Sequence, residues 1–468
     1  MSCQARRRGV VRRKGIKIRK GLPVGRAVEA DEPRRPIGFA ASAAAEKDPQ
    51  PRRALRGELL RHADDGHLIT IAPTGSGKGR SGVVPALLTY PGPTLTIDIK
   101  GENYQVAARR RREMGHRVVV LDPFHTAVEK SDGLNPFDLF NLPGSEPDCD
   151  AELLAEILAG GQTMISKDLF WDVTGKGLLT GLVGYVSEGT SPDERHPGKM
   201  LDLLYADDVD YTLAVALDTH KFKTPLFRQE LAAYLNHESD KCRPSVRSTA
   251  QTFAKCLGSQ SVRACLSRTT FDLQAWLRGE PVDVFLIFPP DKLESHRNVL
   301  RLLLATLLTT LVRRKTMPES RTLLLLDECA QLGALPHLKT ALTLLRGYGV
   351  LVWTLWQDLS QMKNLYPSDW ETILNNSSVV QVFGMSNGWM AKSSAELLGV
   401  AVDRLLRLGK DEQYLMRPGE GSKLTRRVDY LTDREFSGLY DDNPRYPKPG
   451  AAPSRARRPD LPCHALSL

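Results

Sequence analysis

The chain has 468 residues, of which 41% are hydrophobic and 25% are charged, and it carries a formal net charge of +9. This length allows two or three domains, and the composition is ordinary for a soluble globular protein. No uninterrupted apolar run reaches the roughly 18–20 residues that a membrane-spanning helix needs, so no such helix is predicted. The seven cysteines lack metal-binding spacing, which indicates reduced thiols in a cytosolic chain. The positive charge favours a polyanionic partner, either nucleic acid or an acidic membrane surface.

The two ends of the chain differ in composition from its middle. Residues 1–54 are rich in Arg, Lys, Pro and Ala and show no sustained periodicity. They predict a disordered basic arm, or an arm that contacts DNA or anionic lipid. The arm has no apolar segment of the kind that a secretory signal requires. Residues 436–468 are rich in Pro and Arg and are predicted to be a disordered tail.

Between the ends, the sequence predicts an α/β domain that is interrupted by helices. Apolar, partly β-branched runs at 67–73, 94–100 and 116–124 alternate with helical patterns, which is typical of a parallel sheet. These runs place the first part of the domain at 55–149. An all-helical insertion follows at 150–262, and the strand pattern returns in a second part at 263–435. The four strands expected there lie at 282–290, 321–328, 349–357 and 377–385.

A glycine-rich turn, PTGSGKG, follows the first predicted strand. Because a helix is predicted next, backbone N–H groups and the positive end of the helix dipole can hold phosphate oxygens there. Gly75 and Gly77 allow backbone conformations that a Cβ atom would block. Lys78 is expected to reach the β- and γ-phosphates. The residues predicted to bind nucleotide are Thr74, Gly75, Ser76, Gly77, Lys78, Gly79 and Arg80.

The residue after the lysine departs from the usual phosphate-binding loop. A Ser or Thr normally places its hydroxyl on Mg²⁺ at that position, whereas this chain has Gly79. Ser81 is rotated by about 200° from Gly79 around a helix, so it is a poor substitute. Either water completes the metal coordination or the metal binds weakly, and Mg²⁺ commonly keeps several waters.

An acidic strand end supplies the second half of the predicted site. The run TLLLLDE predicts a central strand covered on both faces, followed by two carboxylates at the sheet edge where ligands bind. Asp327 is expected to hold Mg²⁺, and Glu328 to polarise the attacking water. Asp98 and Lys100 close another predicted strand, and either a structural salt link or a contact with the site is expected of them.

These segments, in this order, resemble the VirD4/TraG-type coupling proteins of type IV secretion and conjugation. The resemblance covers roughly residues 55–435, and a glycine after the loop lysine is a familiar variant in that family. It therefore implies that the loop is functional despite Gly79. The blocks that carry the resemblance are APTGSGKG, IDIKGENY, LDPF, LNPFDLF, FWDVTGKGLL, VFLIFPPDKLESHRNVLRLLL, LLLLDECAQLG, GYGVLVWTLWQDLSQMKNLYP and WETILNNSSVVQVFGMSN.

The resemblance implies a RecA-like P-loop NTPase fold that binds ATP and Mg²⁺ and works as a homohexamer. In such motors the site lies between subunits, and a neighbour's arginine stabilises charge on the transferring phosphoryl group. Arg346 stands at the family's position for that arginine, and Gln357 at the position that senses the γ-phosphate. A solvated helix-end arginine and an ordinary strand-end residue are the alternatives for these two side chains.

The function that the resemblance implies is a DNA-stimulated ATPase that recruits a relaxase–DNA complex and feeds it into a type IV secretion channel. The implied partners are single- or double-stranded DNA bound without sequence preference, relaxosome proteins and channel subunits. One alternative is a cytosolic DNA translocase that serves no channel, and another is a docking adaptor that does not hydrolyse nucleotide. Candidate DNA contacts are the basic clusters 109–113, 241–247 and 313–315, for which a solvated helix face is the alternative.

Family members usually carry two membrane-spanning helices before the nucleotide domain, whereas this chain has the basic arm there. The alternatives are a soluble variant docked on a membrane partner, a shortened reading frame, or a chain that binds the membrane surface. We expect the chain at the cytoplasmic face of the inner membrane. Its membrane contact is expected to be indirect or to run through the arm, since Lys and Arg side chains are attracted to anionic lipids.

Overall fold

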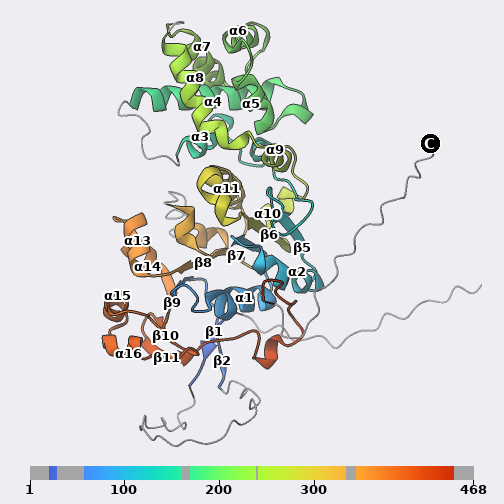
Figure 1. The fold of residues 1–468 in the computed structure, drawn as a ribbon. Coiled ribbons are helices and arrows are strands. Elements are labelled where there is room, and N and C mark those ends of the chain that lie inside the picture. The colour runs from blue at the N-terminus through green and yellow to red at the C-terminus, as the bar shows by residue number, and fades with distance from the viewer. Residues whose placement is uncertain (1–20, 29–56, 161–168, 239–240, 334–343, 447–468) are drawn as a thin grey trace, which may run out of the picture.

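The computed structural model describes residues 21–28, 57–160, 169–238, 241–333 and 344–446. Most of the predicted arm and the end of the predicted tail lie outside these residues. The described part is built around one large sheet with helices on both faces, and a further group of helices is stacked outside the helical layer on one of these faces (Figure 1).

A sheet of 11 strands runs through the molecule in the order β2-β1-β11-β10-β9-β3-β8-β7-β4-β6-β5. Neighbouring strands from β9 to β5 are parallel, and the pairs from β9 to β2 are antiparallel. This arrangement confirms the predicted, mainly parallel sheet. The strands are β1 Leu22–Arg26, β2 Leu59–His62, β3 His67–Ile71, β4 Thr94–Asp98, β5 Arg117–Leu121, β6 Val282–Ile287, β7 Thr322–Leu326, β8 Val350–Trp356, β9 Ser377–Phe383, β10 Glu412–Arg417 and β11 Gly421–Arg426.

The central strands are apolar throughout because helices cover both of their faces. All five residues of β7 and all seven of β8 are buried, as expected for parallel strands inside such a sheet. Alternate residues enter two separate cores. One core packs against α1 (Val84–Thr89) and α2 (Glu102–Glu113). The other packs against α11 (Pro290–Val312) and continues into the stacked helices.

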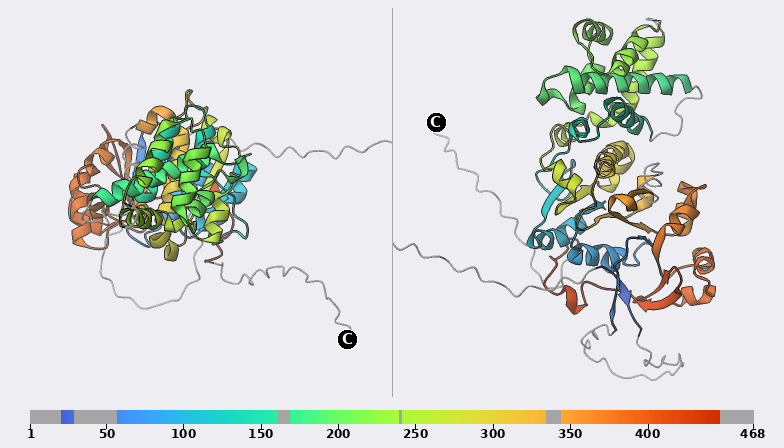
Figure 2. Two further views of the ribbon diagram at one scale, coloured as in Figure 1. Left: turned by 90° about the horizontal axis from the view of Figure 1, so that it is seen from above. Right: turned by 180° about the vertical axis from the view of Figure 1, so that it is seen from behind.

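The stacked helices form an all-helical group beyond α11 (Figures 1 and 2). They occupy residues 147–266 of the described chain, slightly more than the predicted insertion, and the exact domain boundaries stay a prediction. No helix in the described segments combines the length and apolarity needed to cross a membrane. The group consists of α3 Pro147–Ala159, α4 Leu169–Gly189, α5 Pro197–Leu204, α6 Val209–Thr219, α7 Pro225–Leu235, α8 Cys242–Ala254 and α9 Gln260–Leu266. Helix α10 (Leu273–Arg278) packs instead against α11, where Trp276 Nε1 donates a hydrogen bond to the Leu307 carbonyl oxygen (Figure 1).

Two segments that were expected to be disordered belong to the folded part. Strand β1 lies within the predicted arm, and its five buried residues pair with β2 and β11. Arg26 is 4% exposed and contacts Asp433 and Glu435. The start of the predicted tail is also ordered, because Phe436 is fully buried in the core next to α1 and α2. Neither segment has an alternating apolar pattern long enough to predict this packing.

The remaining helices lie along the second half of the chain. Helix α11 starts with Pro290, whose fixed φ suits a first helical turn, and its backbone departs from helical geometry at His296. After β8 come α13 (Leu359–Leu365) and α14 (Trp370–Asn375). Helices α15 (Gly388–Leu398) and α16 (Val402–Leu406) follow β9.

Candidate functional site

The predicted phosphate loop lies between β3 and the helical residues that follow it. The π-helical turn η1 (Gly79–Val83) continues directly into α1. Gly75 and Gly77 have φ values of 75° and 88°, and a Cβ atom added at either would meet no atom within 4 Å. The loop therefore needs these glycines for its backbone conformation, and an open space adjoins it. Ser76 Oγ is buried without a hydrogen-bond partner, so a polar group suited to an anionic ligand is available there.

Three side chains meet at the carboxyl ends of three adjacent strands. Lys78 follows β3, Glu328 follows β7 and Gln357 follows β8, and the sheet order is β3-β8-β7. The Lys78 Nζ atom lies 2.5 Å from Glu328 Oε1. Gln357 Nε2 donates a hydrogen bond of 3.1 Å to Glu328 Oε2. The structure thus brings together the predicted phosphate-binding cation, catalytic base and γ-phosphate sensor.

Glu328 has an unusual backbone, with φ 54° and ψ 47°. Few non-glycine residues occupy this left-handed region, and such outliers cluster at functional sites. The side chain is held on both carboxylate oxygens by Lys78 and Gln357. The position of the Glu328 carboxylate is therefore set by the turn after β7 and by contacts with residues that follow β3 and β8.

Asp327 lies beside Lys78 and Glu328. Its carboxylate is suited to bind a metal ion that also contacts the phosphate oxygens of a ligand. Burial raises the pKa of Asp327, while the Lys78 charge and a hydrogen bond from Asn103 oppose that rise. The described residues contain no cluster of three or more His, Cys, Asp or Glu side chains that would hold a metal ion alone. One carboxylate together with phosphate oxygens and waters is a common coordination for Mg²⁺.

Asp98 and Lys100 do not form the salt link that was one of the expectations for them. Burial, together with the Asp327 charge, raises the pKa of Asp98 to about 7. Asp98 Oδ2 accepts a hydrogen bond of 2.9 Å from the Tyr104 backbone N–H, so this carboxylate closes the turn before α2. Lys100 is exposed.

Arg346 is separated from the other predicted site residues. It lies in the short helix η6 (Leu345–Tyr348), which precedes β8, whereas Gln357 follows that strand. A strand of seven residues spans about 23 Å at the usual rise per residue. An arginine side chain is much shorter than this, so Arg346 lies at the opposite edge of the sheet and cannot reach the site of its own chain.

Sequence reasoning missed a segment after β11 that braces the phosphate loop. Arg427 lies 4.6 Å from the centre of the Phe383 ring and donates a hydrogen bond to the Ser76 carbonyl oxygen. The Asp429 carboxylate accepts hydrogen bonds from Arg80, so the Arg80 guanidinium is directed toward this segment. No local pattern around Arg427 distinguishes it from an ordinary solvated charge, and only the fold brings it to the loop.

In two of the candidate DNA-binding clusters, the structure assigns an arginine side chain to a contact inside the fold. Arg111 is fully buried and pairs with Asp283. The Arg313 side chain is 9% exposed and pairs with Asp150. These arginines stabilise the fold and are not available to contact DNA phosphates.

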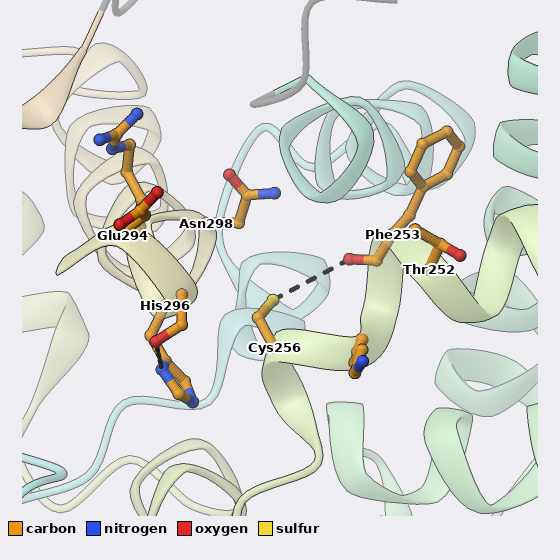
Figure 3. Close-up of a pocket in the computed structure, with 9 residues that line it drawn as sticks. Thr252, Phe253, Cys256, Glu294, His296 and Asn298 are labelled. Atoms are coloured by element: carbon orange, nitrogen blue, oxygen red, sulfur yellow. Dashed lines mark hydrogen bonds between the residues drawn. The ribbon is translucent and has the colours of Figure 1, made fainter. Parts of the chain in front are cut away.

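A cavity of about 580 Å³ lies between the stacked helices and the start of α11 (Figure 3). Its lining includes Cys256, two residues after the end of α8, and His296, where the backbone of α11 departs from helical geometry. None of the residues predicted to bind nucleotide lines this cavity. It is therefore a feature distinct from the phosphate loop.

Residues 28–401 match the protein family described as "Type IV secretory system Conjugative DNA transfer". Protein VirD4 of Rhizobium radiobacter is 26% identical over 349 residues, which cover 70% of this chain and 47% of that protein. The conjugal transfer protein TraG of Escherichia coli is 25% identical over 363 residues, which cover 73% of this chain and 56% of that protein. The chain thus spans about half the length of these curated relatives.

Among solved structures, the plasmid coupling protein TrwB in complex with ADP and Mg²⁺ has a TM-score of 0.61 and is 15% identical. The match covers 89% of this chain and 96% of that chain. At this level of identity, the likeness shows the fold alone, and it confirms the predicted α/β P-loop NTPase architecture. The family match extends over well more than half of the chain. The chain therefore belongs to the family of type IV secretory system proteins for conjugative DNA transfer.

Proposed function

We propose that the chain is an ATPase that couples DNA substrates to a type IV secretion channel. The observation that carries this proposal is the meeting of Lys78, Glu328 and Gln357 at the carboxyl ends of β3, β7 and β8. This is the sheet edge at which open α/β folds bind ligands. Solved structures of TrwB with ADP and Mg²⁺ and with an ATP analogue, in a protein of the same fold, support a nucleotide ligand.

Each side chain then has a defined task. Lys78 and the loop N–H groups would hold the phosphates of ATP, which requires Lys78 to exchange its contact with Glu328 for one with phosphate oxygens. The freed Glu328 would polarise the attacking water, and Gln357 would orient it near the γ-phosphate. Asp327 would hold Mg²⁺, which supplies charge neutralisation between the β- and γ-phosphates when bound.

The family to which the chain belongs supports a wider proposal. We propose that it acts as a homohexamer at the cytoplasmic face of the inner membrane. There it would recruit a relaxase–DNA complex and drive the DNA into the secretion channel. DNA contacts would be made mainly to phosphates, without sequence preference. Arg346 would complete the site of a neighbouring copy, since it cannot reach its own.

The test compares phosphate release by the wild-type chain and by Lys78→Ala, with and without DNA. We expect DNA to stimulate release by the wild type, and the variant to lose both release and ATP binding, because the loop would lack its phosphate-binding cation. Lys78→Ala should also abolish conjugative transfer in cells that depend on this protein. Transfer that survives in Lys78→Ala would instead indicate a docking adaptor. DNA-stimulated hydrolysis without any role in transfer would indicate a free translocase.

Gly79 offers a direct test of how the metal coordination is completed. A Cβ atom at this position would meet no atom within 4 Å, and the residue lies at the start of a helical segment. We expect Gly79→Ser to fold and to lower the Mg²⁺ concentration required for half-maximal ATP hydrolysis, because its hydroxyl can enter the metal coordination. The measurement is a Mg²⁺ titration of ATPase activity.

Gly79→Ala is the matched control for this substitution. Gly79→Ala should gain thermal stability, since glycine in a helix costs about 0.5–1 kcal/mol relative to alanine, and Gly79→Ser should gain less because serine is a weaker helix former. Only the serine variant should change the Mg²⁺ dependence. Identical titration curves for the two variants would show that a hydroxyl at this position does not reach the metal.

A further inference from the structure

The amino ends of β3, β7 and β8 carry a second polar cluster, on the sheet edge opposite the candidate site. Asp65 precedes β3, Arg321 precedes β7 and Arg346 precedes β8. Because these three strands are adjacent and parallel, the three side chains meet. The same three strands therefore carry the candidate site at one end and an arginine cluster at the other.

Contacts within the cluster hold both the side chain and the backbone of Arg346. Arg346 Nη2 forms an ion pair with Asp65 Oδ1. The other Asp65 oxygen accepts a hydrogen bond of 3.3 Å from Arg321 Nη2. Arg321 Nη1 also donates a hydrogen bond of 3.1 Å to the Arg346 carbonyl oxygen. Asp65 thus lies between the guanidinium groups of Arg321 and Arg346. Arg321 also holds the backbone of the turn that carries Arg346.

Arg346 still has hydrogen-bond donors that are accessible from outside the cluster. The Arg346 side chain is 55% exposed, although it is paired with Asp65. Within the described residues, its Nε and Nη1 atoms make no hydrogen bond, so these donors are free to bind an incoming oxyanion. A guanidinium group carries its donors in a rigid fork, so fixing one edge orients the other. The hydrogen bond from Arg346 also lowers the pKa of Asp65.

We propose that Asp65 is a positioning residue that holds Arg346 ready for the nucleotide site of a second copy of this chain. This inference rests on the proposed function. A free arginine side chain samples many rotamers, and restraining it before assembly lowers the entropy lost when it meets the transferring phosphoryl group. The exposed apolar side chains Leu344 and Met317 adjoin this cluster along the chain and supply apolar contact area for the second copy.

Mixed assemblies of two inactive variants test this inference. A Lys78→Ala chain retains Arg346 but cannot hydrolyse ATP, and an Arg346→Ala chain retains its loop but cannot supply the arginine. Neither should be active alone, and mixing them should restore DNA-stimulated hydrolysis at the sites of the Arg346→Ala chains. Adding Asp65→Ala to the Lys78→Ala donor should lower the restored kcat about tenfold with little change in KM, because a misplaced catalytic group costs rate rather than substrate binding.

Two controls separate positioning from a general structural effect. Asp64→Ala in the donor should leave the restored rate unchanged, since Asp64 is exposed and has no ion pair in the described chain. Asp65→Ala in the Arg346→Ala recipient should also have no effect, because the arginine that Asp65 holds is already missing there. Equal losses in donor and recipient would overturn the inference, as would an unaffected Asp65→Ala donor.

The proposed function and the inference fail in different ways. If the wild type hydrolyses ATP but the two inactive chains do not complement each other, Arg346 does not act in a second copy. The inference is then wrong, while the ATPase assignment stands. A wild-type chain without any hydrolysis would overturn the proposed function, and the inference with it.

Discussion

Replacing Glu328 with glutamine is expected to reduce ATP hydrolysis by about 10²–10⁴-fold, the usual contribution of a general base. Glutamine keeps the size of the side chain but cannot accept a proton from the attacking water. Nucleotide binding should persist and become tighter, because ATP no longer has to displace a carboxylate that lies 2.5 Å from Lys78 Nζ. The measurements are kcat from phosphate release and Kd from nucleotide titration.

Glu420→Gln provides the matched control. Glu420 lies at the turn between β10 and β11 and pairs with Lys423 on the surface. Because β10 is antiparallel to β9, and β9 is parallel to β3, this turn lies at the sheet edge opposite the candidate site. Glu420→Gln should leave both kcat and Kd unchanged. Undiminished hydrolysis in Glu328→Gln would exclude Glu328 as the base. Loss of nucleotide binding in that variant would instead assign Glu328 to the binding of ATP.

The second large effect concerns the buried ion pair between Asp283 and Arg111. Both side chains are fully buried, and Asp283 also lies 3.1 Å from His116 Nδ1. Asp283→Asn would leave the Arg111 charge inside the core without its anionic partner. Breaking a buried pair in this way typically costs about 3–5 kcal/mol of unfolding free energy. Urea unfolding of wild type and variant at neutral pH measures the difference.

The same pair predicts how the stability difference depends on pH. Burial alone would raise the pKa of Asp283, but Arg111 and His116 outweigh it and hold the pKa below its usual value of 3.8. The ionised carboxylate therefore stabilises the fold above the unfolded-state pKa, and this contribution is lost as the pH falls through the folded-state pKa. We expect the difference between wild type and Asp283→Asn to be constant near neutrality and to shrink below about pH 4.

Asp272→Asn is the control for this prediction, because Asp272 pairs with Arg278 on the surface and both side chains are more than half exposed. Exposed pairs contribute little to stability, so this variant should unfold like the wild type. A difference between Asp283→Asn and wild type that persists unchanged into acid would show that Asp283 acts through packing and hydrogen bonds rather than through its charge.

Local sequence patterns were sufficient to predict the two halves of the candidate site. The glycines of the loop act within a few residues, because each sets the backbone conformation at its own position. The apolar run before Asp327 likewise predicts a buried central strand without knowledge of its neighbours. The loop, the acidic strand end and the mainly parallel sheet therefore follow from local residue patterns alone.

Other features were outside the reach of such patterns. Strand β1 and the residues around Phe436 lie in compositionally biased segments, yet they are buried by contacts with segments far away in the chain. Arg111 belongs to a basic run that indicates a solvated helix face, but it is fully buried against Asp283. The composition of a segment indicates only whether its residues are exposed on average. Whether one charged side chain is buried depends on a specific partner that lies far away in the sequence.

The sequence by itself determined which residue types are available for chemistry and on which local elements they lie. Only the tertiary structure decided that β8 lies between β3 and β7, and hence that Lys78, Glu328 and Gln357 meet at one edge. The same strand order places Asp65, Arg321 and Arg346 together at the other edge. Strand order is set by long-range pairing and by the packing of both sheet faces, and the periodicity of an individual strand does not encode its neighbours.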